Sequence, residues 1–302
     1  MTAAQWLGLA LQASIVLTVL GLGLTASQQD ATYLLRRPKL LARAVLSMNV
    51  AMPIIAAVIA TTFDLPLEVK VALVALAVSP VPPIIQKKQI SAGGRQEYVI
   101  GLLVAMSLLA IVLVPLTVLI FDEIFGRAAR ITPVSVAKIM LLTVLAPLLV
   151  GLLIRHWAPA AEKAAGTIIA LAGILLVVGV VLLLYGLWPI TRTYIGDGVV
   201  AMLAALAVIG LAVGHLLGGP LAGDRTALAM STSSRHPAVA LAIATSGTVS
   251  EPKPELAIIL LYLVVATFIS LPYQKWRKPA IGAALISKRT AEWRRGLHGH
   301  RD

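Results

Sequence analysis

Long apolar runs separated by short polar connections dominate the chain. A helix needs about 20 apolar residues to cross a hydrocarbon core about 30 Å thick. Nine runs approach this length, at residues 6–25, 40–61, 67–91, 97–121, 134–154, 165–188, 197–218, 224–247 and 256–273. This pattern predicts an all-α, polytopic membrane protein with about nine transmembrane helices. An odd number of spans places the two termini on opposite sides of the membrane.

The composition supports a membrane protein and excludes several kinds of chemistry. Hydrophobic residues make up 59% of the chain and charged residues 13%, whereas about a quarter of an ordinary soluble domain is charged. The absence of cysteine excludes disulfides, thiolate metal sites and cysteine nucleophiles. We expect no cofactor and no metal site. The chain begins without a basic segment or an evident cleavage site, so we expect the first apolar run to remain in the protein.

Basic and acidic connections alternate along the chain and predict its orientation. Arg36, Arg37, Lys87 and Lys88 lie in two basic connections, and the connection between them is acidic. Because lysine and arginine gather on the cytoplasmic side, we expect an external N-terminus and a cytoplasmic C-terminus, in a bacterial inner (plasma) membrane. The net charge of +12 is then a topology signal. We expect the basic tail to rest on anionic membrane lipid rather than on nucleic acid.

Two spans are interrupted at related places in the two halves of the chain. The interrupting residues are Pro80, Pro82 and Pro83 in the third span and Pro237 in the eighth. Paired interruptions of this kind are typical of a transporter site built from an inverted repeat. We therefore predict a first repeat at 1–125, a second at 126–274 and a cytoplasmic tail at 275–302. The plainer alternative is that these prolines kink their helices without functional consequence.

Arg235 is the most unusual residue of the eighth span. It lies ten residues after Arg225, which at about 1.5 Å per residue places it roughly 15 Å deep, near mid-membrane. An ionisable residue at that depth is a candidate functional residue. Arg235 either binds an anion directly or bridges the two interrupted helices through freed carbonyl groups, and both roles are compatible. His236 either carries a proton near neutral pH or is a neutral histidine with satisfied hydrogen bonds.

Other polar residues in the apolar spans are weaker candidates. Asn49 and Ser107 have an ordinary explanation in hydrogen bonds between helices. The sequence leaves open whether Lys87 and Lys88 line a cavity or flank the inner surface. The complete set of predicted substrate-binding residues is Arg235, His236, Ser234, Ser231, Gln86, Ser107 and Asn49.

The order of several short motifs resembles the bile acid:sodium symporter family. These motifs are Gly21-Leu-Gly-Leu-Thr25, Arg37-Pro38-Lys39, Met52-Pro53, Leu65-Pro66-Leu67-Glu68, Ser79-Pro80, Gly214-His-Leu-Leu-Gly218 and Ser234 to Ala244. The resemblance runs from about Leu7 to Tyr273 and extends to the wider group with arsenite and auxin carriers. It implies two broken helices that cross at mid-membrane in a core domain. It also implies a panel domain, made here of spans one, five and six, and a leading helix of some members is missing.

The chain departs from this family where sodium is bound. By resemblance, Ser231 replaces an acidic residue that ligates both sodium ions, and Ser107 matches a sodium-ligating threonine. Arg235-His236 replaces a Gln-Asn pair, Val81-Pro82 a Gly-Gly pair and Ile85-Gln86 a Ser-Asn pair. A guanidinium repels sodium and offers it no lone pair. We therefore predict a secondary transporter of a small or amphipathic organic anion that does not use the usual sodium sites.

Three alternatives remain beside this prediction. The first alternative is a sodium-coupled symporter of the bile acid type, and the second is a non-transporting membrane sensor on a transporter scaffold. The coupling ion is accordingly a proton or sodium. An intramembrane hydrolase using Ser233, Ser234 and His236 is disfavoured, because no carboxylate follows to orient the histidine. We expect that the protein is not an enzyme.

Overall fold

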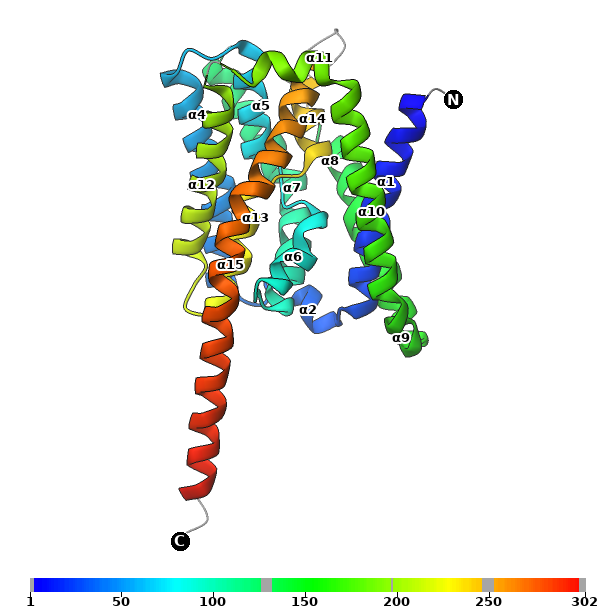
Figure 1. Ribbon diagram of the computed structural model, residues 1–302, viewed down its shortest axis with the longest axis vertical. Helices are drawn as coiled ribbons and strands as arrows, with labels where there is room; N and C mark the ends of the chain where they lie inside the picture. Colours follow the sequence, from blue (N-terminus) through cyan, green and yellow to red (C-terminus); the bar gives the residue numbers. More distant parts are fainter. Residues whose placement is uncertain (1–2, 126–131, 197, 246–252, 299–302) are drawn as a thin grey trace.

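The computed structural model describes residues 3–125, 132–196, 198–245 and 253–298, and these residues form helices and connections without a strand (Figure 1). The first half contains α1 (Ala3–Thr25), α2 (Gln28–Thr32), α3 (Pro38–Val45), η1 (Leu46–Ala51), α4 (Met52–Thr62), α5 (Leu67–Val78), η2 (Pro83–Ile85), α6 (Gln86–Ser91) and α7 (Gln96–Phe125). The second half contains α8 (Pro133–Met140), η3 (Leu141–Leu145), α9 (Ala146–Trp157), η4 (Pro159–Ala161), α10 (Glu162–Gly186), α11 (Trp188–Thr191), η5 (Arg192–Tyr194), α12 (Val199–Leu217), α13 (Ala222–Ser233), α14 (Pro237–Thr245) and α15 (Lys253–His298).

The described helices confirm a polytopic membrane protein, but not the count of nine spans. Six segments are long and apolar enough to cross a membrane: Pro38–Thr62, Gln96–Phe121, Pro133–Trp157, Pro159–Gly186, Val199–Leu217 and Pro254–Lys278. The bent pair Leu67–Val78 and Pro83–Ser91 raises the number to seven. The apolar part of α1, Leu9–Thr25, is shorter than these, and α13 and α14 are 12 and 9 residues long.

Some boundaries of the predicted repeats and spans fall on residues that the structure does not describe. Residues 126–131, with which the second predicted repeat begins, lie outside them, as do residue 197 and residues 246–247 of the predicted spans. The helix α15 runs without interruption through residue 275, where the cytoplasmic tail was predicted to begin. The division into repeats stays a prediction.

Helices α1, α9 and α10 form one packed group (Figure 1). A Cβ added to Gly23 of α1 would lie 2.9 Å from the Cα of Gly151 in α9, and one added to Gly179 of α10 would lie 2.5 Å from Leu11 Cδ2. Such small residues let membrane helices approach closely. The three helices correspond to predicted spans one, five and six, which the resemblance assigned to a panel domain.

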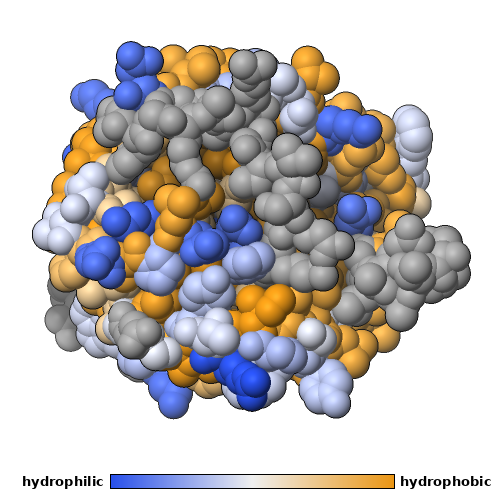
Figure 2. Space-filling view, turned by 90° about the horizontal axis from the view of Figure 1, so that it is seen from above, coloured by the Kyte–Doolittle hydropathy of each residue, from blue (hydrophilic) through white to orange (hydrophobic). Residues whose placement is uncertain are grey.

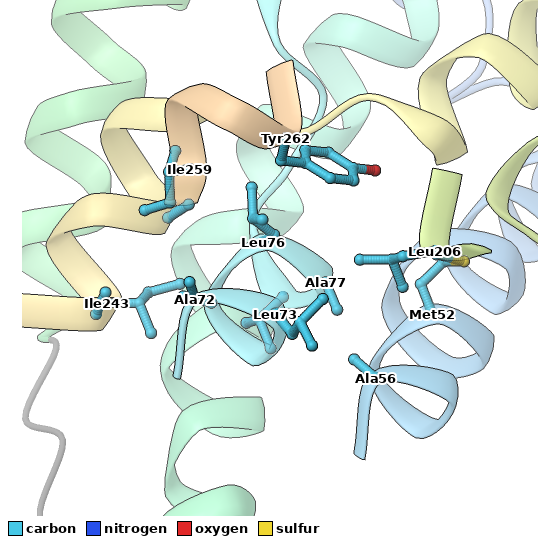
Figure 3. Close-up of a cluster of buried hydrophobic side chains, with 14 of the residues drawn as sticks. Met52, Ala56, Ala72, Leu73, Leu76, Ala77, Leu206, Ile243, Ile259 and Tyr262 are labelled. Carbon is cyan, nitrogen blue, oxygen red and sulfur yellow. The ribbon is translucent and has the colours of Figure 1, made fainter. Parts of the chain in front are cut away.

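The main hydrophobic core is centred on α5 and is built mainly from α4, α5, α7, α8, α12, α14 and α15. Figure 3 shows Leu73, Leu76 and Ala77 of α5 among side chains from α4, α12, α14 and α15. These residues are almost completely buried. Because α5 contacts α4 on one side and α14 with α15 on another, the end of α5 is held in place where its helix breaks.

The ends of the molecule differ in the connections they carry. The connections from α2 to α3 and from α6 to α7 lie toward the end from which α15 projects, and the one from α4 to α5 lies at the opposite end (Figure 1). In the end-on view of Figure 2, hydrophobic residues form parts of the rim, most clearly at the upper and right edges, and hydrophilic residues lie toward the middle and along the lower edge. The hydrophobic parts of the rim are expected for a protein whose sides face lipid.

Three glycines at four-residue intervals, two in α12 and one at its C-cap, face α13. A Cβ on Gly210, Gly214 or Gly218 would lie 2.8 Å from Ser233 Cα, 2.6 Å from Ala229 Cα or 2.3 Å from Arg225 Cα. These neighbours are backbone atoms, which cannot move aside as a flexible side chain can. The glycines therefore position α13, the helix that leads to the second break.

We expect Gly214→Val to destabilise the protein by about 1–3 kcal/mol, because it overpacks this helix contact. The melting temperature of the purified protein in detergent measures the effect. Gly166→Val is the matched control, since a Cβ at Gly166 meets nothing within 4 Å. Equal melting temperatures for the two variants would contradict the assigned role of the glycine face.

Candidate functional site

The two broken helices meet at their breaks. The first break lies between α5 and η2, and the second between α13 and α14. The backbone N–H of His236 donates to Pro80 O over 3.0 Å, and Arg235 Nη1 donates to Ser79 O over 3.1 Å. Because Pro83 has no N–H, it cannot donate the helical hydrogen bond that Ser79 O would otherwise accept. Arg235 therefore satisfies a carbonyl that the first break has freed.

The half-helices on either side of the breaks pack crosswise. Helix α5 packs against α14, and α6 packs against α13. Gln89 of α6 donates through Nε2 to Ala227 O over 3.0 Å and to Ser231 Oγ over 2.5 Å, both in α13. The expected crossing of two broken helices is confirmed by this arrangement.

Neighbouring helices hold the last turn of α13. Tyr262 of α15 donates its hydroxyl to Ser233 O over 2.6 Å. Ser47 Oγ of η1 and Thr232 Oγ1 share a hydrogen bond of 2.8 Å. A helix end leaves carbonyls without intrahelical partners, so the bond from Tyr262 both satisfies one of them and attaches the break to α15.

Arg235 is fully buried and only partly satisfied. Its side chain is 0% exposed, and its Nε and Nη2 have no hydrogen-bond partner within the described structure. None of the ion pairs formed by the described residues includes it. A buried charge without a counter-charge is costly. The guanidinium is thus a fixed positive charge at the crossing, with two of its nitrogen atoms unused as donors.

Several other polar side-chain atoms of the predicted site residues are also buried without partners in the described part of the chain. Both ring nitrogens of His236, Oε1 of Gln86 and Oδ1 of Asn49 belong to this group. Gln86 does use its amide nitrogen, which donates to Pro82 O over 3.0 Å. Ser233 Oγ donates to Met230 O over 3.2 Å, so it does not form the nucleophile–base pair with His236 that a hydrolase would require.

A cavity of about 660 Å³ lies beside the crossing, between α10 and the broken helices. One wall is apolar and comes from α10, with Ile169, Ala170, Gly173, Ile174, Leu176, Val177 and Val178. The opposite wall comes from α6, the second break and α15, and its polar residues are Lys87, Lys88, Ser91, Ser234, Thr267, Ser270 and Gln274. The cavity therefore combines an apolar surface with two cationic side chains.

The structure distributes the predicted site residues over different environments. Ser234 and Pro82 line the cavity, as do both lysines whose position the sequence left open. Arg235 and His236 lie at the crossing, where both are buried. Ser231 contacts Gln89. Ser107 is buried in α7 and Asn49 is half-buried in η1, and neither belongs to the lining of this cavity.

Sequence reasoning missed the contribution of α15 and the bridging role of Gln89. A signal for the first was present, because Thr267, Ser270 and Gln274 recur at the three-to-four-residue spacing of one helix face. The role of Gln89 carried no such signal, since it depends on how α6 packs against α13. Among the described residues, no group of three or more His, Cys, Asp or Glu side chains is placed to hold a metal ion.

Comparison with known proteins identifies the family. No curated protein matches the chain. The profile of the Sodium Bile acid symporter family matches residues 13–188, which is more than half of the chain. The matched region runs from α1 to α11 and includes the first broken helix. On this match, together with the apolar helices and the crossing, the protein is an integral membrane protein that belongs to the sodium bile acid symporter family.

Proposed function

We propose that the protein is a secondary transporter of an amphipathic organic anion, which binds in the cavity between α10 and the broken helices. The observation that supports this most strongly is the contrast between the two cavity walls. Lys87 and Lys88 are exposed on one wall, where they can pair with a carboxylate or sulfonate. The apolar wall of α10 can cover the hydrophobic body of the same molecule.

The place of the cavity also favours transport. It lies between the group formed by α1, α9 and α10 and the helices that surround the crossing, so its two walls belong to different packed groups. A site at such a boundary can open to either side when one group moves against the other. The proposed orientation has the N-terminus outside, with the basic connections and α15 projecting into the cytoplasm.

The crossing supports transport without the usual sodium sites. Donors of the protein already bind oxygens at the crossing: Arg235 binds Ser79 O, and Gln89 binds Ala227 O and Ser231 Oγ, the side chain that by resemblance stands where a sodium ligand would be. We propose that these two side chains hold the broken helices together, a role that bound cations would otherwise fill.

Uptake of taurocholate into proteoliposomes tests the proposed function, because its sulfonate keeps it charged and limits passive leakage. We expect accumulation well above that in protein-free liposomes, and competition by other amphipathic anions. A cationic amphiphile of similar size should neither accumulate nor compete. Uptake equal to the protein-free background, or equal uptake of the cation, would contradict the proposal.

A further inference from the structure

A second cavity is lined by residues of α2, of the connection that follows it and of the start of α7. Helix α2 lies toward the end of the molecule from which α15 projects (Figure 1). The volume of the cavity is about 550 Å³, and its lining includes Arg36 and Arg37 from the connection between α2 and α3. Arg95 and Glu97 line it from the start of α7, and Tyr33 lies between the two groups. It shares no lining residue with the first cavity.

The acidic residues of this second cavity are already engaged. Asp30 Oδ2 accepts hydrogen bonds from the backbone N–H of Ser27 over 2.8 Å and from Gln96 Nε2 over 3.5 Å. Glu97 pairs with Arg95. No carboxylate of the described residues forms an ion pair with Arg36 or Arg37. Two guanidinium groups therefore remain available beside the cavity.

The Tyr33 ring contacts the guanidinium groups of Arg37 and Arg95. The guanidinium of Arg37 lies 3.8 Å from the centroid of the Tyr33 ring, and that of Arg95 lies 5.4 Å from it. Such stacking leaves the edge of a guanidinium, which carries its N–H groups, free to bind an anion. Burial lowers the pKa of Arg95, but the hydrogen bond to Glu97 and the charge of Asp224 more than offset this, so the net shift is upward.

We propose that this cavity binds a phosphate group, carried either by an acidic phospholipid headgroup or by a soluble phosphorylated compound. A guanidinium fork matches two phosphate oxygens at once, and Arg36 and Arg37 supply two forks from adjacent positions. Basic pockets between helices on the cytoplasmic side are suited to acidic headgroups. The volume accommodates a headgroup together with its bridging phosphate.

A bound phosphate would also affect α13, the first half of the second broken helix, through Arg95. Arg95 Nη1 lies 3.5 Å from Oδ1 of Asp224, in the first turn of α13. Asp224 Oδ2 is buried and has no hydrogen-bond partner in the described structure, and the positive charges of Arg95 and, more weakly, Arg37 act on this carboxylate. A phosphate that draws Arg95 toward the cavity would weaken this pair, and we expect its binding to change the rate of transport.

Binding measurements on the purified full-length protein in detergent test the proposal. Glycerol 3-phosphate is the soluble probe and short-chain phosphatidylglycerol the lipid probe, each compared with short-chain phosphatidylcholine. The double variant Arg36→Gln/Arg37→Gln should raise the Kd of the bound probe by at least roughly tenfold. Lys39→Gln/Arg43→Gln is the matched control, because it removes the same charge from the same end of the molecule outside the cavity lining.

Each outcome discriminates between explanations. Binding of both probes supports a phosphate site open to soluble compounds, and binding of phosphatidylglycerol alone supports a lipid site. Failure of both probes to bind, or equal weakening by the two double variants, would overturn the proposal. Arg37→Lys keeps the charge but removes the fork, so it should weaken binding even if the double variant does not fold. Because the measurement is binding, its failure is distinct from a failure of anion transport.

Discussion

Replacing Lys87 and Lys88 together by glutamine is expected to lower the kcat/KM of taurocholate uptake by roughly tenfold to a hundredfold. A hydrogen bond to a charged group contributes about 1.5–3 kcal/mol, and each 1.4 kcal/mol corresponds to a factor of ten. Both lysines line the cavity, where the sulfonate would be bound. Their loss should raise KM most strongly, because they contact the substrate in its ground state as well.

The matched control for this prediction is Lys163→Gln. Lys163 is an exposed residue of α10 and does not line the cavity, so its loss should leave uptake unchanged. The single variants Lys87→Gln and Lys88→Gln divide the effect between the two side chains. Unchanged uptake in the double variant, or an equal decrease in Lys163→Gln, would contradict the proposed position of the anionic group.

The sequence allowed the two helix breaks to be predicted, since proline acts locally, whereas the crossing of the broken helices followed from the resemblance. Pro83 and Pro237 remove N–H donors wherever they occur in a helix, and the structure has a break before each of them. The panel helices followed from the resemblance, and their glycine contacts agree with it. The number of spans was less predictable. Helix α13 is short and rich in polar and small residues, and composition alone does not show whether such a helix is buried within the protein or faces lipid.

The positions of the charged side chains relative to the cavity could not be predicted from the sequence. The depth of Lys87 depends on how many residues of the first break are extended, since an extended residue advances about 3.3 Å and a helical one about 1.5 Å. Arg235 lies within the second break, where no helical period predicts its direction. The structure turns it toward Ser79 O rather than into the lining of the cavity.

Sodium independence is the second expected result, and it concerns the central claim about the crossing. In an effective dielectric of about 20, two positive charges roughly 5 Å apart repel by about 3 kcal/mol, which corresponds to about a hundredfold in affinity. Arg235 supplies that positive charge, and Ser231 supplies no negative charge to offset it. Gln89 further occupies Ser231 Oγ. Without sodium coupling, we expect transport to be uniport, exchange or proton-coupled, and we propose His236 as the candidate proton carrier.

Two changes should restore the conditions for sodium only when they are combined. Ser231→Glu adds a carboxylate to the crossing but leaves the guanidinium, whereas Arg235→Gln removes the guanidinium but adds no negative ligand. Their combination supplies both conditions, so sodium dependence is expected in the double variant alone. Lys163→Gln combined with Ser231→Glu controls for the loss of a positive charge away from the crossing.

The most direct measurement is the initial rate of taurocholate uptake into proteoliposomes at a fixed membrane potential, with sodium replaced by potassium or choline. The account predicts the same rate in all three cations for the wild-type protein, and a rate that rises with sodium for Arg235→Gln/Ser231→Glu. A wild-type rate that depends steeply on sodium would contradict it and would show that transport is coupled to sodium despite Arg235.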